Sequence, residues 1–365
     1  MQPFRPAQKH SEISTFGRKT SSIRTLLTTT NIFSAVFAAI CAPATAGQPQ
    51  VMTSSYDEIF PPKFITSGTP NKSKAECDAT PNAVWITAKW TDKGLFSDSI
   101  STTDECIRYF PSDNAIAGKT AILYFWGDIV LETGSGNDNS NPGYGANSYR
   151  AQVTLANHHA AVNGVPYILI GRPGMYGSTG NTTLYRHSAR EAAIVNAAVD
   201  AIKTELGYDR ISIVGQSGGG GLVGALLTSG RSDLDCVVIS SGTVSLKTRL
   251  RTSRSTQWVR NGQDTTGLPY RQLYDSLDEL DRVSVDNRRR IFMLADPKDE
   301  AVSFVSQKEF SDRANEKGIQ ILLVVAQGRG KQHHSTSAQG IRTAGRCLSG
   351  MTDDEIAKKI MENSP

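Results

Sequence analysis

The residues best placed to do chemistry lie around Ser217, in the segment from Ile211 to Leu227. A short run rich in β-branched residues leads into Gly215-x-Ser217-x-Gly219, and a run of small residues follows. This order predicts a nucleophile elbow, a tight turn between a strand and a helix that presents a serine hydroxyl. Glycines are needed beside the serine because side chains there would collide with the strand or the helix. Ser217 is therefore the candidate nucleophile, and a glycine-rich packing turn is the alternative.

The general base has few candidates, because only two of the six histidines follow Ser217 in the chain. In triads built on this elbow the chain order is serine, acid, histidine. His333 and His334 lie in a loop after an apolar run, residues 319–326, which predicts a buried strand of a parallel sheet. The sequence favours His333 as the base, and His334 is the alternative.

The acid is expected between the serine and the histidines. The apolar run 290–295 predicts another buried strand, and the loop after it carries Asp296 and Asp299. A carboxylate in this loop would orient the imidazole and stabilise the imidazolium. The sequence favours Asp299, because Asp296 ends the strand directly and is also suited to cap the turn at Pro297.

Short apolar segments alternate with helical patterns along the chain, which predicts an α/β fold. Such alternation indicates a doubly wound, mostly parallel sheet with its site at the carboxyl ends of the strands. Segments near 83–90 and 106–110 have the pattern of antiparallel edge strands. The predicted core strands are Ala121–Gly127, Pro166–Gly171, Ile211–Gly215, Cys236–Ser241, Ile291–Ala295 and Ile319–Ala326. The predicted helices are Tyr149–Val162, His187–Leu206, Gly218–Thr228, Ser303–Glu316 and Ser335–Cys347.

From about residue 115 onward the chain resembles an α/β-hydrolase. The run from Asp296 to Val302 resembles the acid loop of the prolyl-oligopeptidase and dienelactone-hydrolase branches, where an aspartate stands three residues before a valine. That resemblance implies that Asp299 is the acid.

The resemblance also implies an oxyanion hole. The strand that ends in Trp126-Gly127-Asp128 is similar to the family's oxyanion strand ending in His-Gly-x, with tryptophan in place of histidine. The implied donors are the backbone amides of Asp128 and of Gly218, the residue after the nucleophile. A carboxylate at Asp128 beside an oxyanion is unfavourable unless the side chain points away.

A cap insertion is expected at about residues 243–285, the usual cap position in this family. Its first half is basic and carries Lys247, Arg249, Arg251, Arg254 and Arg260. The pattern predicts a solvated basic face, and recognition of an anionic substrate or surface is the alternative.

Residues 1–46 differ in composition from the rest and predict a signal peptide, which leaves a hydrolase domain at 47–365. Basic residues precede an apolar run, Ile32–Cys41, that is too short to span a bilayer, and small residues up to Ala46 offer a cleavage site. We therefore expect a secreted or periplasmic protein without a stable membrane anchor after cleavage. An organelle transit peptide is the alternative.

The cysteines fit export. Cleavage of the leader would leave four, and the preferred pairs are Cys77–Cys106 and Cys236–Cys347. Four buried free thiols are the alternative for an intracellular chain. No pair has the CxxC spacing of zinc or thioredoxin-like sites.

Together these features predict a serine hydrolase that cleaves carboxylic esters through an acyl-enzyme on Ser217. No metal or organic cofactor is implied, and the expected partner is a small-molecule ester or short peptide substrate. The net charge of +4 is modest and no basic stripe is interleaved with aromatics, so no nucleic-acid partner is expected. The ester is favoured because nothing resembling a propeller precedes the catalytic region. The alternatives are a serine peptidase or amidase on the same triad, and a catalytically silent fold used for binding.

Overall fold

The fold is described from a computed structural model that defines residues 58–117, 119–129, 147–252, 259–260 and 263–362. The predicted leader, residues 1–46, and Arg254 of the basic segment lie outside these described residues.

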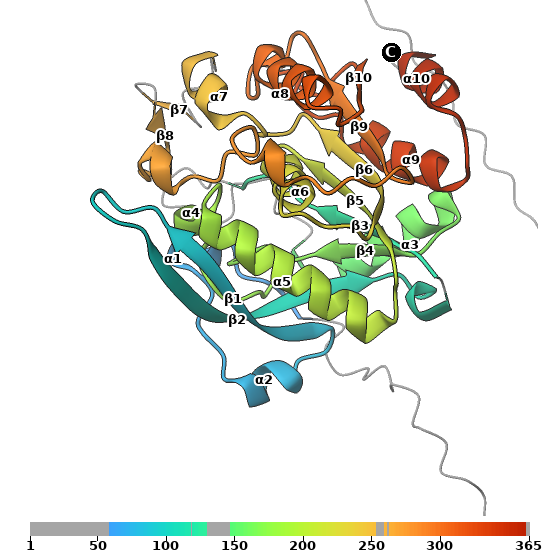
Figure 1. The fold of residues 1–365 in the computed structure, drawn as a ribbon. Helices are drawn as coiled ribbons and strands as arrows, with labels where there is room; N and C mark the ends of the chain where they lie inside the picture. The colour runs from blue at the N-terminus through green and yellow to red at the C-terminus, as the bar shows by residue number, and fades with distance from the viewer. Residues whose placement is uncertain (1–57, 118, 130–146, 253–258, 261–262, 363–365) are drawn as a thin grey trace, which may run out of the picture. The chain divides into compact units, whose positions relative to one another are not determined.

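An eight-stranded sheet forms the centre of the domain, with the strand order β1-β2-β4-β3-β5-β6-β9-β10 (Figure 1). The first two strands pair antiparallel with each other, β2 pairs antiparallel with β4, and the remaining pairs are parallel. The strands are β1 (Ala83–Asp92), β2 (Ser99–Pro111), β3 (Ile122–Phe125), β4 (Tyr167–Ile170), β5 (Ile211–Gln216), β6 (Leu234–Ser240), β9 (Arg290–Ala295) and β10 (Ile321–Val325). The six predicted core strands and the antiparallel edge are thus confirmed.

Helices separate the parallel strands, as the sequence predicts. Serine side chains cap the first turns of α3, α5 and α8, where they accept hydrogen bonds from backbone N–H groups that lack a partner within the helix. The longer helices are α3 (Tyr149–Asn163), α5 (Ala189–Leu206), α6 (Gly218–Thr228), α8 (Phe304–Glu316), α9 (Ser337–Leu348) and α10 (Asp353–Glu362). Helix α10 was not among the predicted elements. The short helices are α1 (Phe64–Ser67), α2 (Lys74–Asp78), α4 (Thr182–Tyr185) and α7 (Leu246–Thr252).

Apart from the edge strand β10, the parallel strands are buried on both faces, and their alternate side chains enter two hydrophobic cores. Ile213 and Val237 lie in the core under α5, α6 and α8, whereas Val214 and Val238 lie in the core under α3, α9 and α10. Strands that are apolar at every position can fill both cores at once, which explains their continuous hydrophobic runs. The carboxyl ends of the strands are therefore left to carry the polar loops of the site.

In its described residues, the segment between β6 and β9 has little regular structure. It contains α7, a two-stranded hairpin of β7 (Val259–Arg260) and β8 (Gln263–Asp264), and two short 3₁₀ helices, η4 (Tyr270–Gln272) and η5 (Leu280–Arg282). The cap that the sequence predicts, at about residues 243–285, falls within this segment.

Both predicted disulfides are present. Cys77 is bonded to Cys106 and Cys236 to Cys347, with Cα–Cα distances of 5.6 and 6.2 Å. The second bridge ties α9, the helix after the histidine loop, to the central strand β6. In the described part of the chain, no helix combines the length and hydrophobicity needed to cross a membrane.

Candidate active site

Ser217 stands at the junction of β5 and α6 with φ 58° and ψ −121°, a backbone conformation that is strained for any residue except glycine. The flanking glycines are needed for space. A Cβ on Gly215 would come within 2.1 Å of the carbonyl oxygen of Gly219, and one on Gly219 within 2.1 Å of that of Phe125. The motif therefore forms the predicted elbow.

The acid and a histidine meet at the carboxyl edge of the sheet. Nδ1 of His334 lies 2.9 and 3.0 Å from the two carboxylate oxygens of Asp299. The Asp299 side chain is fully buried and also accepts hydrogen bonds of 2.9 Å from the backbone N–H groups of Ala301 and Val302. With Nδ1 held by the carboxylate, Nε2 is the nitrogen available to a serine hydroxyl.

His333, the histidine that the sequence favours, is not paired with Asp299. Its Nδ1 lies 3.6 Å from Asp296, and its side chain lines a separate groove together with Pro297 and Met361. The backbone of His333 has a φ of 51°, and this left-handed turn directs the next residue, His334, toward Asp299. Asp296 instead holds the loop by accepting hydrogen bonds from the backbone N–H groups of Lys298 and Gly328. In the structure, Asp299 is therefore paired with His334 and not with His333, the histidine that the sequence favours.

The nucleophile and the histidine loop are joined through Gln216, the residue before Ser217. Its side-chain amide donates to the carbonyl of His334 at 2.9 Å and accepts from the N–H of Thr336 at 3.1 Å. Among the described residues, no hydrogen bond links the Ser217 hydroxyl directly to His334. The His334 side chain is 20% exposed and so remains open to an arriving substrate.

Asp128, the predicted oxyanion residue, has a buried carboxylate with two cationic partners. Oδ1 lies 2.8 Å from Nη2 of Arg172, and Oδ2 lies 2.8 Å from Nε2 of His187. A Cβ on Gly218 would come within 2.1 Å of Oδ1, so the carboxylate lies beside Gly218 rather than far from it. The carboxylate therefore does not point away from the predicted oxyanion hole. Its charge is instead neutralised by two cations, which hold the pKa of Asp128 well below its ordinary value despite burial.

Arg172 fixes the end of β3 in place. Its Nε donates to Glu191 at 2.9 Å, its Nη1 donates to the carbonyl of Trp126 at 3.0 Å, and its Nη2 pairs with Asp128. The guanidinium thus determines where the backbone of residues 126–128 lies relative to the elbow. This role was not predicted from the sequence, although an arginine two residues after the core strand β4 is a usable signal.

His187 bridges two carboxylates and is cationic. Its Nδ1 lies 2.9 Å from Asp264 of β8, and its Nε2 contacts Asp128. Burial alone would lower the pKa of His187, but the two carboxylates outweigh it and raise the pKa to about 9. A buried ionic chain therefore connects the segment between β6 and β9 with the end of β3.

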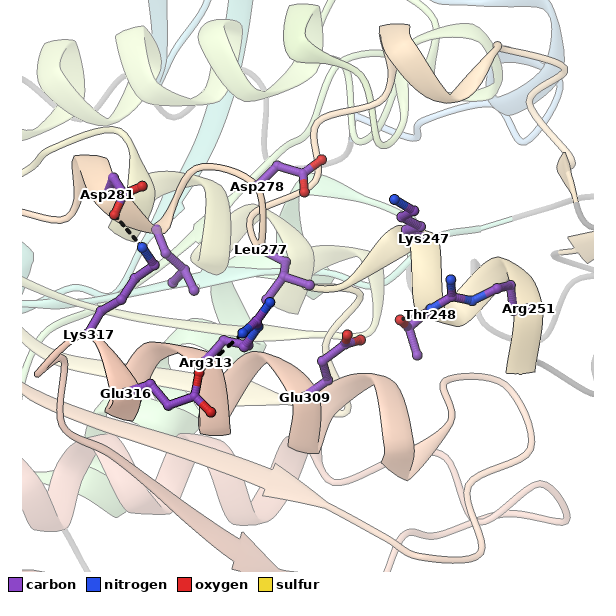
Figure 2. Close-up of a pocket in the computed structure, with 11 residues that line it drawn as sticks. Lys247, Thr248, Arg251, Leu277, Asp278, Asp281, Glu309, Arg313, Glu316 and Lys317 are labelled. Atoms are coloured by element: carbon purple, nitrogen blue, oxygen red, sulfur yellow. Dashed lines mark hydrogen bonds and ion pairs between the residues drawn. The ribbon is translucent and has the colours of Figure 1, made fainter.

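The groove between α7 and α8 is separate from the residues of the candidate active site. This groove of about 480 Å³, lined by charged side chains of α7, α8 and the loop near Leu277, contains none of Ser217, Asp299 and His334 (Figure 2). In the described ranges, no group of three or more His, Cys, Asp or Glu side chains is arranged to hold a metal ion.

Residues 191–345 match the model of the prolyl oligopeptidase family. The matched region begins in α5 and contains Ser217, Asp299 and both loop histidines. No curated protein sequence matches the chain.

Solved structures to which this chain is similar include esterases and a peptidase. An esterase from Pyrococcus furiosus, Pf2001, is 12% identical with a TM-score of 0.42, and the match covers 77% of this chain and 96% of that one. Est1E from Butyrivibrio proteoclasticus, solved with ferulic acid, is 13% identical with a TM-score of 0.48, covering 69% and 96%. The acylaminoacyl peptidase of Pyrococcus horikoshii is 14% identical with a TM-score of 0.44, covering 75% of this chain but 41% of that one.

The family match, the elbow and the sheet order together confirm the predicted resemblance. The chain has an α/β-hydrolase fold and is a serine hydrolase.

Proposed function

We propose that the protein hydrolyses carboxylic esters with Ser217 as nucleophile, His334 as general base and Asp299 as the acid that orients it. The observation that carries this proposal is the short contact between His334 and Asp299, held beside the strained Ser217 backbone by Gln216. This triad keeps the predicted serine and acid and exchanges His333 for its neighbour.

In acylation, Nε2 of His334 takes the proton from the Ser217 hydroxyl as Oγ forms a bond with the ester carbonyl carbon. The electron pair of the carbonyl moves to its oxygen. That oxyanion accepts hydrogen bonds from the backbone amides of Gly218 and Asp128. When the bond to the alcohol oxygen breaks, the leaving alcohol takes the proton from His334, and the acyl group remains on Ser217.

Deacylation repeats these steps with water. His334 removes a proton from the water as its oxygen attacks the acyl carbon, and the same proton then returns to the Ser217 oxygen as that bond breaks. Asp299 stays ionised throughout and stabilises the imidazolium that forms in each step. The products are a carboxylic acid and an alcohol.

Residues 243–285 act as a cap in this proposal, and residues 1–46 as a signal peptide that directs the protein to the periplasm or the outside of the cell. The two disulfides support an oxidising compartment, because such bonds are rare in reducing ones.

Peptide or amide hydrolysis is the second candidate, favoured by the match to the prolyl oligopeptidase family. Both reactions use the same triad and differ in the leaving group. A panel of acyl esters and matched anilides, assayed on the same preparation, separates the two.

The decisive experiment is labelling of the mature protein with a fluorophosphonate, followed by intact-mass measurement and peptide mapping. We expect one label on Ser217 in wild type and none in Ser217→Ala. A folded wild-type protein that takes no label and hydrolyses no ester or anilide would reject the proposal.

A further inference from the structure

Arg249 of α7 is a fully buried arginine, and two of its three guanidinium nitrogens have no hydrogen-bond partner among the described residues. The residue is 1% exposed, and these two nitrogens are Nε and Nη1. The nearest ion pair is long, because Nη1 lies 3.7 Å from Oδ2 of Asp264. That oxygen already bonds to His187 at 2.9 Å. Buried charged groups normally have close partners, so this guanidinium is unusual.

The guanidinium is connected to the site through a chain of ionic contacts. Nη1 lies 3.7 Å from Asp264, His187 bridges Asp264 and Asp128, and the Asp128 carboxylate lies beside Gly218. Asp264, Asp128 and Asp299 attract the charge of Arg249, whereas the guanidinium of Arg186 repels it. Each of these carboxylates is already held by a histidine: His187 bonds two of them, and His334 bonds the third. None of them is therefore left to pair with Arg249 at hydrogen-bond distance.

Arg108 is a second buried arginine with N–H groups that lack a hydrogen-bond partner among the described residues. Unlike Arg249, it has contacts that compensate its charge. Its guanidinium lies 5.6–5.8 Å from the ring centres of Phe60, Phe110 and Tyr149, and its Nη1 lies 2.8 Å from Glu58. Aromatic rings and a close carboxylate compensate that charge. Arg249 has no comparable ring contact in the described part of the chain.

The other basic residues of α7 point elsewhere. Lys247 and Arg251 are exposed and line the groove of Figure 2, where Arg251 also bonds to Thr248 at 3.0 Å. Arg249 is two residues from each, about 200° around a helix, and so lies on the opposite, inward face. The predicted solvated basic face is thus correct for Lys247 and Arg251 and wrong for Arg249.

We propose that Arg249 binds a carboxylate of the substrate, so that the enzyme prefers esters that carry a second, free carboxylate. The inference rests on the proposed function. A guanidinium matches a carboxylate with two parallel hydrogen bonds, and such a pair is strongest where water is excluded. A substrate carboxylate would supply the close hydrogen-bond acceptor that Arg249 lacks among the described residues.

The test uses mono-4-nitrophenyl esters of adipic, pimelic and suberic acids, each compared with the neutral 4-nitrophenyl ester of the same chain length. The measured quantity is the ratio of kcat/KM for the anionic ester to kcat/KM for its neutral partner. For wild type we expect a ratio of about 10 to 100 at the length that spans from Ser217 to Arg249. Free dicarboxylate of that length should inhibit more strongly than the corresponding monocarboxylate.

Arg249→Gln is the test variant, Arg249→Lys retains the charge, and Arg251→Gln is the matched control. Arg249→Gln should bring the ratio to about 1, and Arg249→Lys should retain part of the preference. Arg251→Gln removes the same charge from the outer face of the same helix, so its ratio should stay within about twofold of wild type.

A wild-type enzyme that hydrolyses the neutral esters but prefers no anionic partner would overturn the inference while the proposed function stands. A preference that survives in folded Arg249→Gln would overturn it as well. If both Arg249 variants fail to fold, the wild-type ratio and the inhibition by free dicarboxylate still test the inference, because a ratio of about 1 without such inhibition would overturn it. Failure to hydrolyse any ester, with no fluorophosphonate label, would instead reject the proposed function.

Discussion

The side-chain amide of Gln216 donates a hydrogen bond of 2.9 Å to the backbone carbonyl of His334. The residue before the nucleophile thus holds the loop of the proposed base, and the same amide accepts from the N–H of Thr336 at 3.1 Å. These two long-range hydrogen bonds of one side chain fix the distance between the elbow and the histidine loop. Gln216 is a positioning residue in this view, since it acts on the reaction only through His334.

Gln216→Leu should lower kcat by about 10- to 100-fold with a smaller change in KM, because a base displaced by about 1 Å loses much of its efficiency. Steady-state kinetics and the rate of fluorophosphonate labelling measure the effect. Gln332→Leu is the control, because Gln332 contributes a backbone carbonyl to Glu300, which the substitution leaves in place. A Gln216→Leu enzyme with normal kcat would remove the positioning role.

Replacement of the two histidines should give opposite outcomes. His334→Ala should lower kcat/KM by about 10⁴-fold, since it removes the group that contacts Asp299, whereas His333→Ala should change it by less than about tenfold. Ester hydrolysis by the two purified variants measures this directly. The reverse order would restore His333 as the base.

Replacement of the two aspartates should also have different effects on activity. Asp299→Asn should lower kcat by about 10⁴-fold with little change in KM, because the amide favours the wrong tautomer of His334. Asp296→Asn should act mainly on stability, since Asp296 accepts backbone hydrogen bonds from Lys298 and Gly328. Activity assays with thermal unfolding of both variants make the comparison. Similar kinetic losses in both would contradict the assignment.

His187 predicts a pH dependence of stability. Its pKa is raised from 6.5 to about 9 by Asp128 and Asp264, with Arg172, Arg186 and Glu191 as the neighbouring charges. A raised pKa in the folded state stabilises fully below about pH 6.5, and this contribution is lost as the pH rises through about 9. It amounts to about 3 kcal/mol.

Urea unfolding between pH 6 and 10 measures the loss. His187→Gln should flatten the curve over this range, and replacement of the exposed His158 by Gln should leave it unchanged. A wild-type free energy of unfolding that stays constant from pH 6.5 to 9 would show that His187 is not the charged bridge.

The strands and the elbow could be predicted because their signals are local. Continuous apolar runs specify buried parallel strands, and the glycines around Ser217 are required by contacts within one turn. The choice between His333 and His334 was not local, because it depends on a left-handed φ at His333 and on a carboxylate 35 residues away. The inward direction of Arg249 could have been read from helical periodicity, since Lys247 and Arg251 flank it at two residues on each side.

The bridge between Cys236 and Cys347 closes the intervening main chain into a covalent ring. That ring contains α7, Asp299 and His334, whereas Ser217 lies outside it. A protease that cuts the chain once anywhere inside the ring would therefore release no fragment. The cleaved molecule would migrate as a single band on a denaturing gel until a reductant separated the two pieces. A serine and its histidine would then remain on one molecule even after the backbone between them had been broken.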